Sequence, residues 1–465
     1  MLPRALTALA VCIPLALSGC TVFRSYQSEL TETSQYLASG NVDGAIGLLE
    51  ANNDGEDKDL LYYLEKGELL RSRGDFAGSQ AAWRQADQQV YQWEEAVKAD
   101  PGRYLAEFSA YLINDKMRRY EGYDYEKVML TTQMALNDLA LNDFDSARTE
   151  IKKTHEREAL IAELRDKEYL EREEEAERQG VTTELKDLNG YPVGALNSPE
   201  VLGLKNSYQS AFSHYLAGFV YEALGERGLA APGYRKAAEL RPETPLLEQA
   251  LLDLDSPPPE ADESEVLVVI QSGFAPARDS VRIPLPLPLD SGLVVSTVSF
   301  PILRDDNTTR PPSDLLIDGE AAELTELGSI RAMSYRALLD DMPGIILRTT
   351  VRAVSRGVAQ KQLNDNGNPW ASLAVGLMST LTEGADERTW RTLPNSIRVA
   401  RLRLSRGEHR LTLPTAYGLT ELDLKVERPY QVIPVRVVAG QVFAHGAATR
   451  TPTPGVPAVA STHTP

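Results

Sequence analysis

The chain has 465 residues, of which 42% are apolar and 25% are charged, and its formal net charge is −19. This length is sufficient for about two or three domains with cores of their own, and the composition is typical of globular rather than disordered proteins. The acidic excess excludes broad binding of nucleic acid through its phosphates, so we expect no nucleic-acid partner.

The chain begins with a targeting signal. Arg4 supplies a positive charge, and the apolar run from Ala5 to Leu17 has the length of a signal-peptide core, which is too short to span a bilayer. The run ends in "LSGC", residues 17–20, which resembles the lipobox of bacterial lipoproteins. The alternative interpretation is an ordinary cleaved signal peptide.

The lipobox resemblance implies that the signal peptide, residues 1–19, is removed and that Cys20 is lipidated. Its thiol would carry diacylglycerol and its amino group an acyl chain, and we expect no other cofactor. Thr21, rather than Asp, after the cysteine implies an outer-membrane anchor in a Gram-negative cell, with the protein facing the periplasm. Because Cys12 lies inside the signal, the mature chain retains one cysteine and forms no internal disulfide.

After a lipidated tether of residues 20–27, a helical pattern extends over residues 28–254, where apolar residues recur at intervals of three and four. Four turn-like segments interrupt this pattern, around Gly40, Gly74, Asn142 and Gly225. The first step between them is 34 residues and the second is 68, twice that period, whereas the third is 83 and breaks the register.

A period of 34 residues with a small polar turn between two helices resembles the tetratricopeptide repeat. Two copies carry the resemblance: Tyr63, Gly67, Leu70, Gly74, Trp83 and Ala86 in one, and Gly218, Tyr221, Gly225, Ala230, Tyr234 and Ala237 in the other. The small residues let two helices approach, and the aromatic residues fill the space between them. The copy near Phe108 lacks its turn and that around Asn142 is weak, so we expect a degenerate helical array with a concave groove for a partner.

The rest of the helical region contains a charged helix and a loop. Residues 146–179 carry many alternating charges and are predicted to form a long solvent-exposed helix. Such a helix could bind a basic partner or calcium, but no carboxylate spacing matches a calcium loop, which favours a solvated face. Residues 188–199 are predicted to be a loop, and the proline-rich residues 255–265 a linker to a second domain.

Residues 266–445 are predicted to form an α+β domain, with a sheet or small sandwich and an inserted pair of helices. Prolines at 284, 286 and 288 favour an edge strand or an extended segment in this region. Two strands, "IRVARLRL" from Ile397 and "HRLTL" from His409, flank "SRGE" and are predicted to pair as a hairpin. The inserted helices are one that contains Leu347 and a second that begins at Trp370, and a disordered tail is expected over residues 446–465.

We predict neither a catalytic site nor a metal site, because no recognised spacing of His, Cys, Ser or glycine residues occurs. Two segments are candidate partner contacts. The first is a basic stripe of Arg348, Arg352 and Arg356, suited to a carboxylate-rich partner, lipid headgroups or an anionic polymer unless these arginines pair within the chain or are simply solvated.

The second candidate is an elbow between helix and strand with Asp386, Arg388, Trp390 and Arg391. Trp390 could anchor a partner there, or it could cap the core at a corner of the chain while the charges pair locally. The second interpretation is favoured for this segment.

The segments "LVVIQSGFAPARDSVRIPLP", "DMPGIILRTTVRAVSR" and "ADERTWRTLPNSIRVARL" resemble a family of proteobacterial repeat-containing envelope lipoproteins. The resemblance implies a multi-domain architecture, an all-α tetratricopeptide-like array followed by an α+β domain, but no activity or substrate. We therefore predict a non-enzymatic outer-membrane scaffold or adaptor for an envelope protein, in envelope assembly or in the regulation of cell-wall synthesis. The alternatives are a cell-wall enzyme with a site at Asp386–Arg391, and a lipid- or glycan-binding carrier that uses the arginine stripe.

Overall fold

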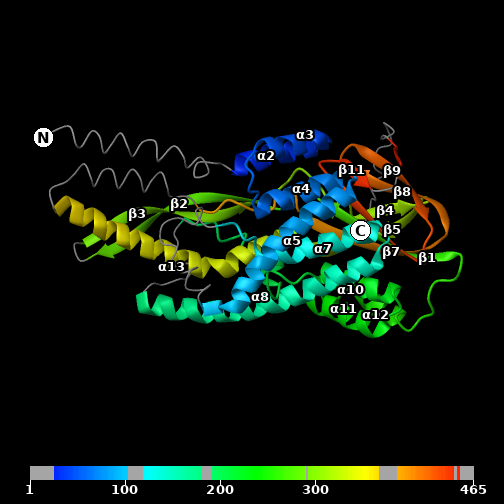
Figure 1. The fold of residues 1–465 in the computed structure, drawn as a ribbon, viewed down its shortest axis with the longest axis horizontal. Coiled ribbons are helices and arrows are strands. Elements are labelled where there is room, and N and C mark those ends of the chain that lie inside the picture. The colour runs from blue at the N-terminus through cyan, green and yellow to red at the C-terminus, as the bar shows by residue number, and fades with distance from the viewer. Residues whose placement is uncertain are drawn as a thin grey trace, which may run out of the picture.

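The computed structural model describes residues 26–102, 119–179, 190–289, 292–365, 385–444 and 448–450. Figure 1 shows an elongated molecule in which helices cover the strands at one end, while a long strand pair and helix α13 extend toward the other end. Within the described residues, no helix is both long and apolar enough to cross a membrane.

The helical part consists largely of hairpins. Four pairs pack together: α2 (Tyr26–Ala38) with α3 (Val42–Ala51), α4 (Leu60–Ser72) with α5 (Phe76–Ala99), α7 (Asp124–Ala140) with α8 (Phe144–Gln179), and α10 (Ala211–Ala223) with α11 (Arg227–Leu240). The short α9 (Pro199–Leu202) and α12 (Pro245–Asp253) complete this part. Residues 190–198 lack regular structure, as predicted for that part of the loop.

The four hairpin turns coincide with the four turn-like segments of the sequence. Each contains a residue with positive φ: Gly40 at 83°, Gly74 at 86°, Asn142 at 59° and Gly225 at 75°. This left-handed conformation ends a helix, and glycine and asparagine adopt it at the lowest cost. At the second turn the Asp75 carboxylate then accepts a hydrogen bond from the Gly78 backbone N–H and so begins the next helix.

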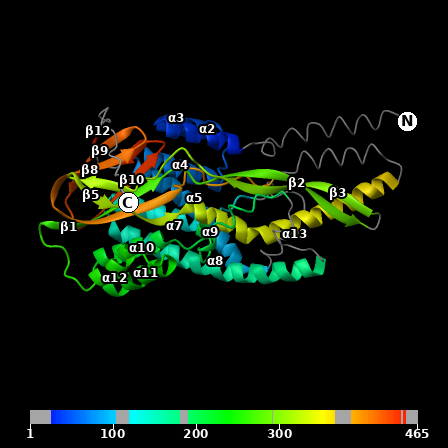
Figure 2. The ribbon, with the colours of Figure 1, turned by 180° about the vertical axis from the view of Figure 1, so that it is seen from behind.

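The strands form two five-stranded sheets. The first has the order β11 (Gln441–Ala444), β10 (Tyr430–Val438), β1 (Glu263–Ser272), β7 (Ser396–Ser405) and β6 (Thr325–Ser329). The second has the order β12 (Ala448–Arg450), β9 (Gly418–Val426), β8 (Gly407–Thr415), β4 (Asp314–Ile317) and β5 (Glu320–Glu323). Figure 2 shows this strand-rich end from behind, with β8 and β9 on its outer side.

Strand β1 joins the sandwich to the helices because its two faces are both buried. Val266, Val268 and Ile270 belong to the apolar cluster between the two sheets, whereas Leu267 and Val269 belong to the cluster that includes the helical hairpins. Alternate side chains of a strand point to opposite faces, so an uninterrupted apolar run suits a strand covered on both sides. The predicted sandwich is thus present, with helices on its other face.

The predicted hairpin of β7 and β8 is wrong. Strand β7 pairs with β1 and β6, whereas β8 pairs with β9 and β4 in the other sheet. The chain passes between the sheets at Gly407, whose φ is 143°. A corner between two packed sheets needs the same kind of turn residues as a hairpin, so the local signal did not distinguish them.

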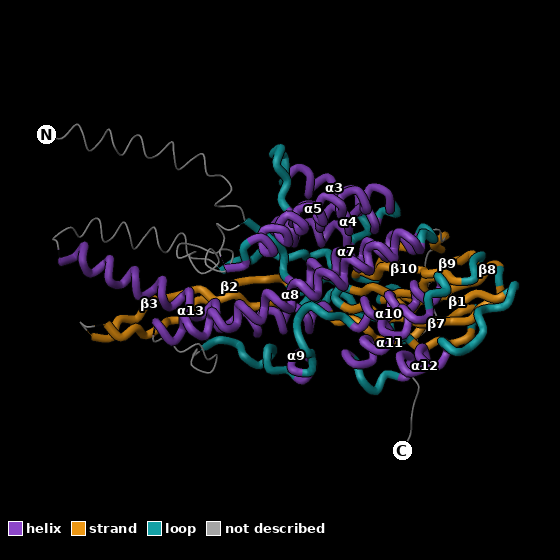
Figure 3. The backbone as a smooth tube through the Cα atoms, turned by 60° about the horizontal axis from the view of Figure 1, so that its bottom comes forward, coloured by secondary structure: helices purple, strands orange, loops and turns teal. Residues whose placement is uncertain are grey.

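The proline-containing strand β2 (Ala277–Leu289) pairs along its whole length with β3 (Gly292–Arg304) and with no other described strand. Pro284, Pro286 and Pro288 occupy alternate positions, so their missing N–H groups lie along one edge of β2. That edge is the one away from β3, as predicted for an edge strand. In Figure 3 this ribbon runs out from the sheets and lies beside α13 (Ile330–Asp365).

The prediction of a fully solvated helix over residues 146–179 needs correction. Helix α8 starts at Phe144, and one face of its first half is buried rather than solvated; Arg157 there donates hydrogen bonds to Glu94 at 2.6 Å and Asp87 at 2.8 Å. These carboxylates of α5 stabilise a guanidinium inside the helical part. The first inserted helix is α13, whereas the second, from Trp370, lies outside the described residues.

The helical part and the sheets share one apolar core. A single cluster contains Trp83 and Leu136 from the hairpins together with Leu267, Ile397 and Val432 from the first sheet. The residues between α12 and β1 therefore connect two parts that pack against each other, and β1 already begins at Glu263, inside the predicted linker. The prediction of a disordered tail over residues 446–465 is wrong for residues 448–450, which form β12 and pair with β9. The other residues of the predicted tail lie outside the described ones.

Candidate functional site

The residues predicted to pack the repeats lie inside two hairpins. A Cβ atom at Gly67 would lie 2.1 Å from Trp83 Nε1, and one at Gly218 would lie 2.5 Å from Tyr234 Cδ1. The turn glycines Gly74 and Gly225 are exposed. The other residues of the two copies are buried or partly buried, namely Tyr63, Leu70, Ala86, Tyr221, Ala230 and Ala237. In each hairpin a glycine of the first helix thus receives an aromatic ring of the second, which is a packing role.

The elbow, residues 386–392, crosses the inner face of α4 and α7. The Glu126 carboxylate accepts hydrogen bonds from the Trp390 backbone N–H at 2.8 Å and the Thr389 hydroxyl at 2.9 Å. The Glu65 carboxylate accepts from the backbone N–H groups of Arg391, at 2.5 Å, and Thr392, at 3.2 Å. Two buried carboxylates of the helical part therefore bind the main chain of the elbow.

Trp390 is fully buried and packs edge-to-face against Trp83, with ring centroids 5.9 Å apart. Trp390 therefore does not anchor a partner in this structure, because no part of the ring is exposed. The buried ring agrees with the other interpretation, in which Trp390 caps the core. The expected open concave groove is not present at α4 and α7, because the elbow contacts both helices. Where α4 and α7 would present an inner face to a partner peptide, the chain's own elbow occupies it.

A cavity of about 150 Å³ lies next to the elbow, where the start of α7, the middle of α8, α13 and β2 meet. Among its described lining residues, seven carry a positive and five a negative charge. The cations are Arg119, Lys127, Arg165, Arg172, Arg278, Arg348 and Arg388, and the anions are Glu121, Asp124, Glu168, Asp341 and Asp386. Charged side chains from five segments of the chain therefore converge here.

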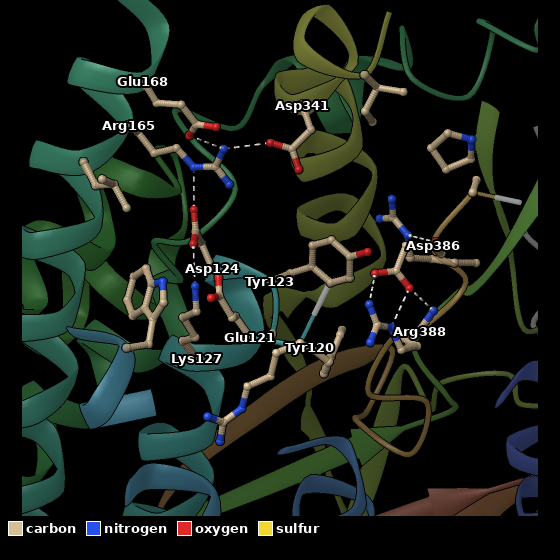
Figure 4. Close-up of a pocket in the computed structure, with 18 of the residues that line it drawn as sticks. Tyr120, Glu121, Tyr123, Asp124, Lys127, Arg165, Glu168, Asp341, Asp386 and Arg388 are labelled. Atoms are coloured by element: carbon tan, nitrogen blue, oxygen red, sulfur yellow. Dashed lines mark hydrogen bonds and ion pairs between the residues drawn. The ribbon is translucent and has the colours of Figure 1, made fainter. Parts of the chain in front are cut away.

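Arg165 forms three ion pairs at one side of this cavity. Figure 4 shows it between three carboxylates, with Asp124 at 2.6 Å, Asp341 at 2.7 Å and Glu168 at 3.0 Å. Although burial alone would raise them, the nearby Arg165 guanidinium holds the pKa values of Asp124 and Asp341 below their usual range. These carboxylates are therefore ionised and already engaged by a cation.

The other side of the cavity contains the elbow and strand β2. Arg388 donates from Nε and Nη2 to the two carboxylate oxygens of Asp386, each at 2.8 Å, as Figure 4 shows. Arg278 of β2 lies over the Tyr123 ring, 4.3 Å from its centroid, and donates from Nε to the Asp386 carbonyl at 3.4 Å. The guanidinium of Arg278 is thus sandwiched between an aromatic ring and the elbow.

The structure brings three of the predicted contact residues together at the cavity. Arg348, Asp386 and Arg388 all line the cavity, although about forty residues separate the stripe from the elbow. Arg352 instead donates to the Arg348 carbonyl and the Thr349 hydroxyl of its own helix. The side chain of Arg356 and the lipidation residue Cys20 lie outside the described residues.

Sequence reasoning missed the residues that complete the cavity. Arg278 lies just before the predicted proline-containing strand, Arg165 lies in a helix predicted to be solvated, and Tyr123 lies in the predicted helical region. The one local signal was the charge of Arg278 at the start of a proline-rich apolar strand. Nothing local indicated that it would meet α8 and α13, because that proximity depends on how these elements pack.

The arrangement of the cavity suits binding of a polar, anionic group. Within the described part of the chain, no group of three or more His, Cys, Asp or Glu residues is placed to hold a metal ion. Asp386, a candidate acid in the enzyme alternative, has both carboxylate oxygens bound by Arg388. The described lining residues include six arginines and five carboxylates, and guanidinium groups are donors suited to an anion.

No protein-family model matches the chain, and no curated protein matches it. Among solved structures, MamA is similar over 47% of this chain and 80% of its own, at 12% identity and a TM-score of 0.25. PilW, a widely conserved type IV pilus biogenesis factor, is similar over 48% and 96%, at 13% identity and a TM-score of 0.14.

A tetratricopeptide repeat protein from Parabacteroides merdae is similar over 49% of this chain and 98% of its own, at 13% identity and a TM-score of 0.13. Similarities this low carry no functional argument. The tetratricopeptide-like description of the helical part therefore depends on its own features, which are the paired helices, the positive-φ turns and the glycine–aromatic contacts.

Proposed function

We propose that the protein is a lipid-anchored scaffold or adaptor of the Gram-negative outer membrane, facing the periplasm and without enzymatic activity of its own. The lipobox at Cys20 supports the anchor, and the helical hairpins support a role in binding protein partners. Anchoring raises the effective concentration of a bound partner at the membrane. An envelope protein in envelope assembly or cell-wall synthesis is the partner that fits this position.

One observation about α8 carries the proposal. From Tyr169 to Arg178, the described side chains of α8 are exposed or partly exposed, and Tyr169 and Leu170 are 66% and 60% exposed. Acidic residues surround them, among them Glu171, Glu173, Glu174 and Glu177. Because the elbow fills the inner face of α4 and α7, we assign the partner contact to this exposed half of α8, with a partner whose surface is basic and partly apolar.

The anchor is tested with Cys20→Ala. We expect this change to abolish acylation and to release the protein from membranes, because the thiol of Cys20 carries the first lipid. Incorporation of a labelled fatty acid and fractionation of cells measure the two effects. Acylation at the wild-type level in the variant would contradict the anchor.

The partner contact is tested by in-cell cross-linking, with the captured proteins identified by mass spectrometry. Tyr169→Ser with Leu170→Ser is expected to lose a partner that the wild type captures, without a change in thermal stability. Tyr417→Ser with Leu419→Ser is the matched control, since those side chains are 62% and 47% exposed at the β8–β9 turn. Equal capture by both double variants would overturn the assignment to α8.

A second candidate function is a carrier for a lipid or glycan. The observation that favours it is the convergence of Arg348, Asp386 and Arg388 on a cavity with more cations than carboxylates. A carrier needs a site for one chemical group rather than a partner surface, and the cavity offers charged donors to such a group.

A further inference from the structure

Arg278 is a buried cation whose hydrogen-bonding capacity is incompletely used. It is 3% exposed, and the carboxylates that attract it, Asp386 and Asp341, are bound by Arg388 and Arg165. Its Nη1 has no hydrogen-bond partner among the described residues. Burying a guanidinium donor without an acceptor is unfavourable, so an acceptor supplied by a ligand would stabilise this arrangement.

Two further guanidinium groups meet at the wall of the same cavity, at Gly344 of α13. A Cβ atom at Gly344 would lie 3.1 Å from Arg172 Nε and 3.2 Å from Arg348 Nη1. The lack of a side chain at Gly344 thus lets arginines from α8 and α13 approach each other. Arg172 Nε is itself buried and has no hydrogen-bond partner among the described residues.

Four carboxylates of the cavity already have basic partners. Asp124 is bound by Arg165 and Lys127, and Asp386 is bound by Arg388. Glu168 and Asp341 are shared between Arg165 and Arg172, with Asp341 3.6 Å from Arg172 Nη2. An anion that enters the cavity would therefore meet carboxylates that are already paired.

We infer that this cavity binds a phosphate-type oxyanion, held by Arg278 of β2, Arg172 of α8 and Arg348 of α13. Guanidinium groups on three different elements can donate to several oxygens of a tetrahedral anion at once. A planar carboxylate offers two oxygens and would leave part of this donor set unused. The phosphate can belong to a free phosphate ester or to a lipid headgroup, and the inference does not depend on the scaffold function.

Calorimetric titration of the full-length protein in a neutral detergent tests the inference, with inorganic phosphate, succinate and short-chain phosphatidylglycerol as probes. We expect saturable binding of phosphate with one site per chain. Arg348→Gln is expected to weaken it by about tenfold to a hundredfold, the usual effect of losing a charged hydrogen-bond donor. Arg278→Gln is expected to do the same, and Arg348→Gln covers the case in which the variant at the buried position does not fold.

Arg178→Gln is the matched control, because Arg178 lies at the exposed end of α8 and pairs with Glu175. Unchanged phosphate binding in this control, with loss in the two cavity variants, supports the inference. Tighter binding of phosphatidylglycerol than of inorganic phosphate, also lost in the cavity variants, supports it with a headgroup as the source. The inference is overturned by no saturable binding, by binding of succinate alone, or by phosphate binding that the cavity variants leave unchanged.

Discussion

At the scale of single residues, the two glycine–aromatic contacts decide how closely each helix pair packs. Gly67 and Gly218 occupy equivalent places in their hairpins, and each lies against a ring of the second helix. Trp83 also donates from Nε1 to the Leu64 carbonyl at 3.1 Å, which fixes the position of the ring. A side chain at Gly67 could therefore be accommodated only if the helices moved apart.

We expect Gly67→Ala to lower the free energy of unfolding by about 2 kcal/mol, the range for overpacking of a closely packed site. Gly47→Ala is the matched control, because Gly47 lies in α3 and a methyl group added there would have no other atom within 4 Å. That change should stabilise the protein by up to about 1 kcal/mol, as alanine favours helix more than glycine. Urea unfolding measures both, and equal effects would contradict the packing role of Gly67.

Asp138 of α7 is a buried carboxyl group with an unusual environment. Gln80 donates to its Oδ1 at 3.2 Å, while its Oδ2 has no hydrogen-bond partner among the described residues. Burial, reinforced by the nearby Glu150 carboxylate, raises the pKa of Asp138 to about 7. The folded protein therefore keeps a proton that the unfolded chain releases near its ordinary pKa of 3.8.

The raised pKa of Asp138 makes the free energy of unfolding depend on pH. Between about pH 4 and pH 7 the folded state binds more protons than the unfolded state, so the free energy of unfolding falls as the pH rises. Asp138→Asn removes this dependence and should stabilise the protein at pH 8 relative to wild type, on the order of 2 kcal/mol, with little difference at pH 4. Urea unfolding at both pH values measures it, and a gain of equal size at pH 4 would exclude the assignment.

At the scale of elements, the elbow joins the two parts of the molecule through its main chain. Glu65 of α4 and Glu126 of α7 accept hydrogen bonds from successive residues of the elbow, and Arg436 of β10 donates to the Thr392 carbonyl at 3.0 Å. Burial raises the pKa of Glu65 to about 7 and that of Glu126 above its usual range, so these bonds are charge-assisted, and stronger, where the carboxyl groups are ionised. The elbow is therefore held from both the helical and the sheet side.

We expect Glu126→Gln to increase the hydrogen-exchange rate of the Trp390 amide by about tenfold or more, because an amide oxygen accepts less strongly than a carboxylate. Exchange measured by mass spectrometry on peptides that cover the elbow reports the change. Glu163→Gln is the control, since Glu163 lies on the exposed face of α8, where it forms an ion pair with Lys167 of the same helix. Equal exchange in the two variants would mean that Glu126 does not restrain the elbow.

At the scale of the whole molecule, the shared core makes the two parts one folding unit. The apolar cluster that includes the hairpins also contains side chains from β1, β7 and β10 and the fully buried Trp390. Separating the parts would expose one face of the first sheet and the inner face of α4 and α7. Large apolar surfaces of this kind are unfavourable in water.

We therefore expect the full chain to unfold in one cooperative transition. Thermal unfolding followed by far-ultraviolet circular dichroism, which reports helix, and by the fluorescence of the four tryptophans, among them the buried Trp83 and Trp390, should give the same midpoint. Trp390→Ala should lower both midpoints together, because the ring belongs to the shared core. Two separate midpoints in the wild type would show that the helical part and the sheets fold independently.

The sequence predicted features that depend on neighbouring residues along the chain. The turns at Gly40, Gly74, Asn142 and Gly225 were found because a left-handed residue and a following cap are local requirements. The edge role of β2 followed from its prolines for the same reason. The partners of β7 and β8 did not follow, because a hairpin and a corner between sheets share their local turn signal.

Local sequence patterns predicted the helix-rich first part with its hairpins and the strand-rich second part, and lipidation of Cys20 stays a prediction. The tertiary structure alone decided that the elbow fills the inner face of the helices and that Arg278, Arg172 and Arg348 line one cavity. The physical reason is that hydrogen-bonded turns and apolar periodicity act over a few residues. Convergence of charges from α8, α13 and β2 depends on how whole elements pack, which no local pattern encodes.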